Sequence, residues 1–161
     1  GVPHPPATPD EVRMLPGVPE ALDRLAAAGF LLIVVTNQPD VARGTTTRAE
    51  VEAINARVMA GLALHGLEVC YHDNRDGCDC RKPAPGMLLR AARRENIDLA
   101  RSFMVGDRWR DVEAGLRAGC RAVLVRGEET EAVEVQPWAT VGSLAEAADR
   151  ILRDERRGGG A

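Results

Sequence analysis

The chain has 161 residues, of which 45% are hydrophobic and 28% charged, and its formal net charge at pH 7 is −3. A chain of this length and composition is typical of one globular domain with its own core. We therefore expect a single domain over residues 1–161, present as a monomer. The small negative charge gives no basis for a surface that binds nucleic acid or membranes. No apolar run reaches the length of a membrane span, and the first residues do not resemble a secretory signal, so we expect a cytoplasmic protein.

Apolar periodicity and turn residues divide the chain into alternating helices and strands. A proline-rich loop over residues 1–15 comes first, and the helix that follows it ends at Gly29. The later elements are predicted as a strand over 30–35, a helix over 45–66, a strand over 67–72, a helix over 84–96, a strand over 102–105, a helix over 109–119, a strand over 121–125 and a terminal helix from residue 143, which gives way to a flexible tail over 154–161.

Strands that alternate with helices predict an α/β fold with a parallel sheet covered by helices on both faces. Ligands of such folds bind beyond the carboxyl ends of the strands. Polar or metal-binding residues stand at three of these ends, namely Thr36-Asn37-Gln38, Cys70-Tyr71-His72 and Gly106-Asp107-Arg108. The sequence therefore predicts a functional site at this edge of the sheet.

Three of the four cysteines lie within residues 70–80, together with a histidine, in the pattern Cys70-x-His72 followed by Cys78-x-Cys80. Three thiolates and one imidazole complete the tetrahedral shell of zinc and leave no open position, so we predict a structural zinc site. The alternative is a loop of free cysteines. An iron–sulfur cluster fits less well, because only three thiolates are close and a histidine lies among them. The remaining cysteine, Cys120, is predicted to be a small buried hydrophobic residue.

Arg81 and Lys82 directly follow the last zinc ligand, and Lys82 is the only lysine among 21 basic residues. An ammonium is a compact point charge whereas a guanidinium is a planar fork, so a single lysine in an arginine-rich chain suggests a position that requires the ammonium. A zinc-fixed loop would direct both cations towards a phosphate. The alternative is a solvated basic pair, with the composition due to chance.

Asp107 lies at the end of a predicted strand and Asp111 one helical turn later, so the two carboxylates fit a magnesium site. Thr36 and Asn37 lie at another strand end, where a hydroxyl and an amide can hold an oxyanion. The alternative for both groups is a local role, as a helix N-cap or in a turn.

A strand that ends in Thr36-Asn37, then Lys82, then a strand that ends in Gly106-Asp107 with Asp111 four residues later resembles motifs two, three and four of the haloacid-dehalogenase (HAD) phosphatases. The zinc pattern followed by Arg-Lys-Pro and by Gly-Met-Leu-Leu (86–89) is similar to a narrower group within that superfamily. This group contains the D-glycero-D-manno-heptose 1,7-bisphosphate phosphatases and the histidinol-phosphate phosphatases. Residues 36–44 resemble the heptose group, with Pro39-Asp40 in place of Ser-Gly, whereas the five-residue gap in the zinc loop is closer to the histidinol-phosphate group.

The resemblance covers residues 15–126 and implies a Rossmann-like three-layer α/β fold of HAD type with a zinc-binding loop. It also implies a Mg²⁺-dependent phosphatase that acts on a small sugar phosphate through a phosphoaspartyl intermediate. The roles that it implies are phosphoryl binding and charge neutralisation by Thr36 and Lys82, magnesium binding by Asp107 with Asp111 behind it, and substrate binding by Asn37, Gln38, Arg43, Arg81 and Arg108.

The family's first motif, a strand followed by Asp-x-Asp, has no counterpart here, because no two aspartates of the chain are separated by a single residue. The first of those aspartates is the family's nucleophile. We expect the missing strand and motif to precede residue 1 of this sequence. The principal hypothesis is a heptose bisphosphate phosphatase, and the alternatives are a histidinol-phosphate phosphatase and a non-catalytic zinc-containing module that binds a phosphorylated ligand. A zinc knuckle for nucleic acid is disfavoured by the negative charge and the few aromatic residues.

Overall fold

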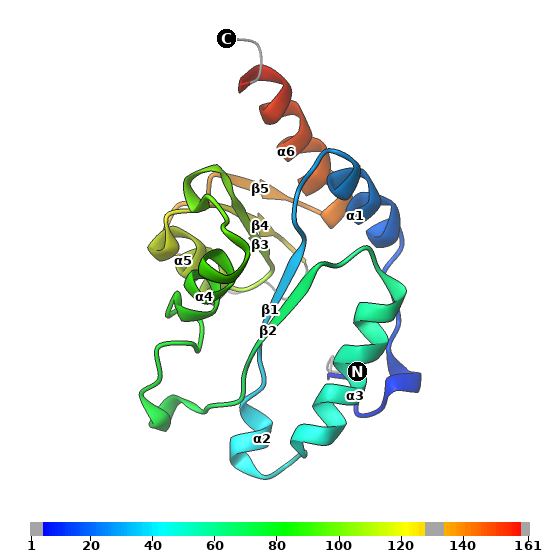
Figure 1. Cartoon of the computed structure of the whole chain (residues 1–161), viewed down its shortest axis with the longest axis vertical. Coiled ribbons are helices and arrows are strands. Elements are labelled where there is room, and N and C mark those ends of the chain that lie inside the picture. Colours follow the sequence, from blue (N-terminus) through cyan, green and yellow to red (C-terminus); the bar gives the residue numbers. More distant parts are fainter. Residues whose placement is uncertain (1–4, 128–133, 159–161) are drawn as a thin grey trace.

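The computed structural model describes residues 5–127 and 134–158 as an α/β fold (Figure 1). The helices are α1 (Val18–Ala27), α2 (Pro39–Arg43), α3 (Arg48–Gly61), α4 (Gly86–Glu95), α5 (Trp109–Ala118) and α6 (Leu144–Gly158). The strands are β1 (Ile33–Asn37), β2 (Gly66–Cys70), β3 (Phe103–Gly106), β4 (Arg121–Val125) and β5 (Ala139–Val141). Within the described ranges, no helix has both the length and the apolar character needed to cross a membrane.

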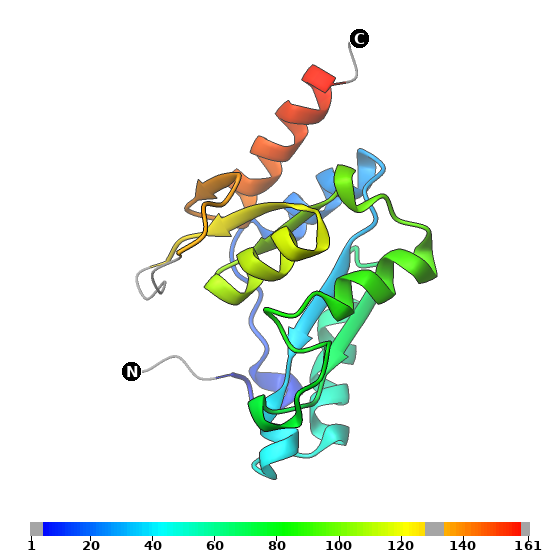
Figure 2. The same ribbon diagram turned by 90° about the vertical axis from the view of Figure 1, so that its left-hand side faces the viewer.

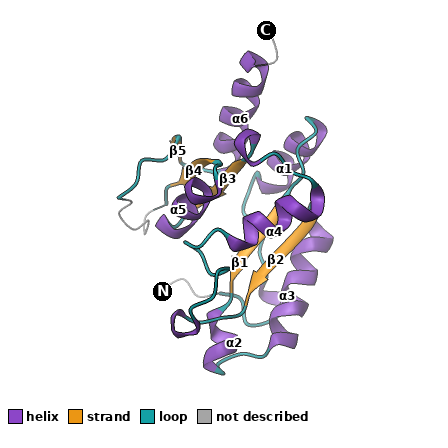
Figure 3. Cartoon of the chain, turned by 60° about the vertical axis from the view of Figure 1, so that its left-hand side comes forward, coloured by secondary structure: helices purple, strands orange, loops and turns teal. Residues whose placement is uncertain are grey.

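The described strands form two parallel sheets, with the orders β1–β2 and β3–β4–β5. Figure 3 shows the two sheets and the helices that lie against them. The predicted α/β class with parallel strands is thus confirmed, although the strands are divided between two sheets. This division places β1 and β3 at sheet edges.

Side chains from alternate positions of β3 pack against helices on opposite faces of its sheet, as the two-residue period of a strand requires. Phe103 and Val105 pack against the hydrophobic cluster of α1 and α6. Met104 lies in a different cluster, with Ala114 of α5. Figure 2 shows this part of the molecule from the side, with α6 in red. Helices therefore cover both faces, which is the three-layer arrangement.

Several element boundaries differ from the prediction. Helix α1 stops just before Gly29, whose φ of 93° suits glycine, as expected for a helix end. In contrast, α3 ends at Gly61 and not at Gly66, where β2 already begins. The apolar and helix-favouring residues after Gly61 gave no local stop signal, and the extended backbone of Leu62 ends the helix there.

The short elements α2 and β5 were not predicted, because five and three residues are too few to display a period. The expected N-terminal loop contains a single 3-10 turn at Pro9–Glu11, and residues 1–4 lie outside the described ranges. The tail expected from residue 154 is helical as far as Gly158, because α6 continues through it. Residues 159–161 also lie outside the described ranges.

A cleft of about 700 Å³ is lined by residues of both edge strands, β1 and β3. Across the β1–β2 pair, His65 N donates to Leu32 O and Gln38 N donates to Cys70 O, so the even-numbered residues direct their backbone groups to β2. The odd-numbered residues, including Val35, therefore direct theirs to the open edge. The same reasoning applies to β3, because Ser102 O accepts from Arg121 N of β4. The cleft is thus bordered by backbone groups from two strand edges.

Candidate active site and metal centre

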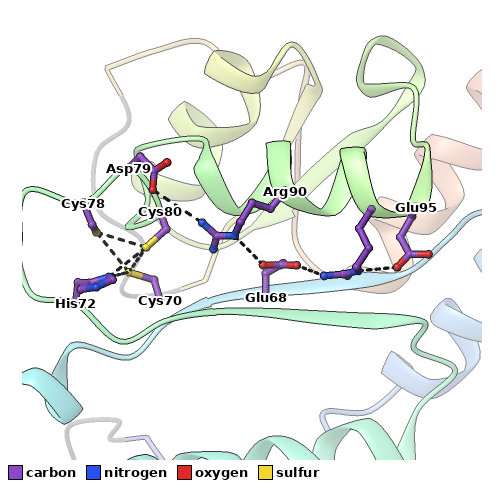
Figure 4. Close-up of polar contacts among 9 residues, drawn as sticks. Glu68, Cys70, His72, Cys78, Asp79, Cys80, Arg90 and Glu95 are labelled. Atoms are coloured by element: carbon purple, nitrogen blue, oxygen red, sulfur yellow. Dashed lines mark hydrogen bonds and ion pairs between the residues drawn. The ribbon is translucent and has the colours of Figure 1, made fainter.

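The four predicted zinc ligands come together at the carboxyl end of β2. Their ligand atoms all lie within 4.8 Å of one another. The sulfur of Cys80 is 3.1 Å from that of Cys70 and 3.5 Å from that of Cys78, and the Cys70–Cys78 separation is 3.8 Å. His72 Nδ1 is 3.3 Å from the Cys80 sulfur. Figure 4 shows the four side chains directed towards a common point.

This donor set fits zinc. Zinc–sulfur bonds of about 2.3 Å in a tetrahedron place neighbouring sulfurs about 3.8 Å apart. The Cys70–Cys78 separation matches this value, and the other two sulfur separations are shorter. Cys70 and Cys80 are buried, and together with Met87 they form a hydrophobic cluster that anchors the loop ends. Burial, followed by hydrogen bonding with Cys80, raises the pKa of Cys70 to about 12. A metal must therefore displace protons from this site when it binds.

Lys82 occupies a nearly buried position beside the same cleft, with its side chain 11% exposed. Its Nζ atom donates to Val35 O at 2.8 Å, on the open edge of β1, and lies 2.6 Å from Asp111 Oδ1. An ammonium carries three N–H donors, and these described contacts account for two of them. The third donor can therefore serve an anion at the strand ends.

Asn37 fixes the backbone of Lys82 from the end of β1. Its amide nitrogen donates to Lys82 O at 3.1 Å, and its amide oxygen accepts from Lys82 N at 3.0 Å. The Lys82–Pro83 peptide bond is cis. Both polar groups of the Asn37 side chain are thus engaged with the protein, so in this structure Asn37 positions Lys82.

Asp111 lies at the first turn of α5, with its side chain only 8% exposed. One of its oxygens pairs with Lys82, and the other accepts from the backbone N–H of Arg108 at 3.1 Å. Asp107, at the end of β3, keeps 68% of its side chain exposed, 3.7 Å from Arg108 Nε. The first turn of α5 is therefore held by Asp111, and Asp107 is free of the capping role considered for it.

Gly106 permits the close approach of Asp111. A Cβ atom at Gly106 would lie 2.3 Å from both Cβ and Oδ2 of Asp111. We expect Gly106→Ala to push Asp111 away from Lys82 and to lower the free energy of unfolding by about 1–3 kcal/mol, as overpacking does elsewhere. Chemical denaturation measures this loss. Gly44→Ala is a suitable comparison, because a Cβ there meets nothing within 4 Å and only the strain of a φ of 75° remains. Equal losses in the two variants would contradict the proposed contact.

Arg43 and Arg81 are both held by the zinc loop. Arg43 Nε and Nη2 contact the two carboxylate oxygens of Asp73 at 3.1 and 2.8 Å, and hydrogen bonding to Arg43 lowers the pKa of Asp73 to about 2. Arg81 Nε donates to Asn74 Oδ1 at 2.7 Å, and its Nη1 donates to His72 O at 3.3 Å. The segment between the zinc ligands therefore sets the directions of both guanidinium groups.

The other predicted residues occupy the same end of the molecule. Thr36 lies within β1, and its hydroxyl accepts from the side-chain amide of Gln38 at 3.2 Å. Both are partly buried. Sequence reasoning did not find Asp73 or Asn74, which direct the two arginines. Their position between the zinc ligands was the available signal, but an exposed Asp-Asn pair in a loop is normally only a turn.

The sequence pattern that defines the HAD-hydrolase-like family matches residues 79–151. A D-glycero-beta-D-manno-heptose-1,7-bisphosphate 7-phosphatase of Bordetella bronchiseptica is 38% identical over 157 residues, covering 91% of this chain and 88% of that enzyme. The chain belongs to the HAD-like hydrolases. The enzyme of the same name from Escherichia coli K12 is 36% identical to this HAD-like chain over 163 residues, covering 91% of this chain and 85% of the relative. The superfamily inferred from the motifs is thereby confirmed.

Solved structures agree with this family. The D,D-heptose 1,7-bisphosphate phosphatase of B. bronchiseptica, crystallised with magnesium and phosphate, superposes with a TM-score of 0.79 at 35% identity, covering 92% of this chain and 88% of that one. The corresponding enzyme from Burkholderia thailandensis gives a TM-score of 0.66 at 27% identity, with 89% of each chain covered. The HAD-type architecture expected from the motifs is therefore confirmed.

Proposed function

We propose that this protein is a Mg²⁺-dependent phosphatase that removes a phosphate from a sugar bisphosphate, D-glycero-D-manno-heptose 1,7-bisphosphate. The observation that carries the proposal is the placement of Lys82. Its side chain is nearly buried at the carboxyl ends of the strands, where Asn37 fixes the backbone and Val35 and Asp111 fix the ammonium. The relatives from Bordetella bronchiseptica and Escherichia coli K12 bear the name of this phosphatase, and they support the choice of substrate.

The chemistry of phosphoryl transfer suits this arrangement. A phosphoryl group in transfer carries its charge on three equatorial oxygens, and catalysis consists mostly of positioning and charge neutralisation. Lys82 would contact one of these oxygens, and the Thr36 hydroxyl would hold another. Arg81, Arg43 and Arg108 would bind the rest of the substrate, with Asn37 and Gln38 keeping the strand end in place. These roles agree with the donors that the strand ends present.

Asp107 would hold the magnesium ion, with Asp111 behind it. Magnesium prefers one or two carboxylates together with water and phosphate oxygens, and the exposed carboxylate of Asp107 fits that preference. Both oxygens of Asp111 are already engaged, so its part is to orient Lys82 and the turn that carries Asp107. The bound ion would supply neutralisation of phosphate charge.

The nucleophile is proposed to come from a further strand that ends in Asp-x-Asp and lies in the cleft between β1 and β3. The backbone groups of both edges point into this cleft, and apolar side chains such as Ile33 and Phe103 line it. A strand that paired with both edges would join the two sheets into one. Its carboxyl end would lie beside Lys82 and Asp107.

Phosphate release tests the proposal. We expect the protein extended upstream by the Asp-x-Asp segment to hydrolyse heptose 1,7-bisphosphate with a kcat/KM at least about tenfold above that for histidinol phosphate, in the presence of magnesium. Residues 1–161 alone should bind phosphate but release none from either compound. Equal rates on the two compounds would remove the substrate assignment, and no hydrolysis by the extended chain would remove the enzymatic proposal.

A second candidate is a non-catalytic module that binds a phosphorylated ligand. The observation that favours it is that no two aspartates of the chain are one residue apart, so the nucleophilic motif is missing from the sequence. Retention of tight, saturable sugar-phosphate binding without turnover in the extended protein would support this candidate.

We also propose that the protein works in the cytoplasm as a monomer. All four cysteines of the chain are free thiols in the structure, and such thiols persist in a reducing compartment. The bound zinc would then protect three of them from oxidation.

A further inference from the structure

Arg90 of α4 lies between the cysteine cluster and a buried carboxylate on β2 (Figure 4). Its Nε atom is 3.3 Å from Glu68 Oε2, and its Nη1 atom is 3.9 Å from the carboxylate of Asp79, the residue between two zinc ligands. Glu68 is only 8% exposed, although it is charged. The guanidinium is thus placed next to the metal centre by one buried and one exposed carboxylate.

The same carboxylate holds a second arginine that serves as a natural reference. Arg94, one helical turn after Arg90, contacts the other oxygen of Glu68 and also Glu95. Both arginines therefore attach α4 to β2 through Glu68. They differ in their second partner. Arg90 also contacts Asp79 beside the cysteine cluster, whereas Arg94 also contacts Glu95.

The charge of a loaded metal site explains the placement of Arg90. Three thiolates, one neutral imidazole and one Zn²⁺ sum to a net charge of −1, and two of the sulfurs, those of Cys70 and Cys80, are buried. A buried negative charge is costly unless a cation or hydrogen-bond donors balance it. Arg90, held beside these cysteines by Glu68 and Asp79, supplies such a cation.

We propose that Arg90 is a positioning residue of the metal centre, which balances the charge of the thiolate-rich zinc site and slows the loss of zinc. Groups that contact metal ligands from outside commonly change metal affinity by about 10- to 100-fold. Zinc leaves such a site when a ligand detaches, and a guanidinium held beside the cluster favours the attached thiolates. The proposal rests on the zinc assignment but not on phosphatase activity.

Zinc transfer to an excess of a chromophoric chelator tests this proposal on the whole, zinc-loaded protein. We expect Arg90→Gln to release zinc about tenfold faster than the parent. Arg94→Gln, which removes a comparable contact with Glu68, should stay within about twofold of the parent. The rate of zinc release from Arg90→Lys should lie between those of Arg90→Gln and the parent, because lysine keeps the positive charge but lacks the planar guanidinium.

A second measurement separates a role at the metal from a role in attaching α4. The melting temperature of Arg90→Gln should fall further than that of Arg94→Gln when zinc is bound, and the two should fall equally after zinc is removed. Equal zinc release from Arg90→Gln and the parent, or equal acceleration in the two glutamine variants, would overturn the proposal. A parent protein without zinc by elemental analysis would overturn it together with the zinc assignment, whatever its phosphatase activity.

Discussion

Replacing Lys82 with alanine should lower kcat by about a hundredfold or more in the protein that carries the Asp-x-Asp segment. Loss of a single donor to a developing oxyanion costs about that much in other enzymes. The effect is large here because the Lys82 side chain is 11% exposed and its Nζ atom is fixed by Val35 O and Asp111, so no reorganisation is needed when charge develops on the phosphoryl oxygens. Lys82→Arg should also have a low kcat, since a planar guanidinium does not fit between those two partners.

The Lys82 experiment needs a control for stability. Removing one member of a buried ion pair leaves the other uncompensated and costs about 3–5 kcal/mol, and both side chains are at most 11% exposed here. The double variant Lys82→Met with Asp111→Asn replaces both charges by neutral groups of similar size. It should recover most of the stability lost in Lys82→Ala and remain as inactive as that variant.

Steady-state kinetics and denaturant titrations distinguish a loss of catalysis from a loss of stability. A low kcat in a double variant of nearly parental stability shows that the ammonium acts on the phosphoryl group. Near-parental kcat in Lys82→Ala would instead mean that Lys82 serves only the fold, through Val35 and Asp111, and the phosphatase proposal would lose its central residue.

The metal cluster was predictable because its ligands lie within eleven residues, from Cys70 to Cys80, and their types alone define the chemistry. The approximate positions of the strands were also predictable, since continuous apolar runs mark buried parallel strands, but the first strand, predicted over 30–35, is β1 over 33–37, and the second, predicted over 67–72, is β2 over 66–70. The division into two sheets differs from the single sheet predicted, and it leaves β1 and β3 as edge strands.

Contacts between distant parts of the chain could not be inferred from any local pattern. The side-chain amide of Asn37 bonds to the backbone of Lys82, 45 residues away, and Asp73 contacts Arg43 across 30 residues. Sequence reasoning assigned Asn37 to the substrate because an amide at a strand end is available for that purpose. The structure shows both polar groups of this amide bonded to the backbone of Lys82. Register and loop paths decide such contacts, and a single sequence does not contain them.

Either Cys80→Ser or a strong chelator should remove the one zinc ion that we predict. In the extended protein, this loss should raise KM by about tenfold or more and lower kcat by a smaller factor. The zinc loop directs Arg81 through Asn74 and Arg43 through Asp73. Without metal the two pairs of ligands are no longer joined, so the two arginines that are proposed to bind substrate should lose their directions. Lys82 keeps its contacts with Asn37, Val35 and Asp111, which lie outside the loop, so kcat should fall less than in Lys82→Ala.

Cys120→Ser supplies the matched control for the zinc experiment, because it removes a buried thiol outside the cluster. Burial alone raises the pKa of Cys120 to about 11, as expected for an unreactive core thiol. This variant should keep one zinc per chain by elemental analysis and a parental KM, whereas Cys80→Ser should contain none. Limited proteolysis should then cut Cys80→Ser within residues 73–77, where the parent and Cys120→Ser resist. A zinc-free Cys80→Ser protein with parental KM would show that the arginines are directed without the metal, and a parent protein without zinc would end the assignment of the site.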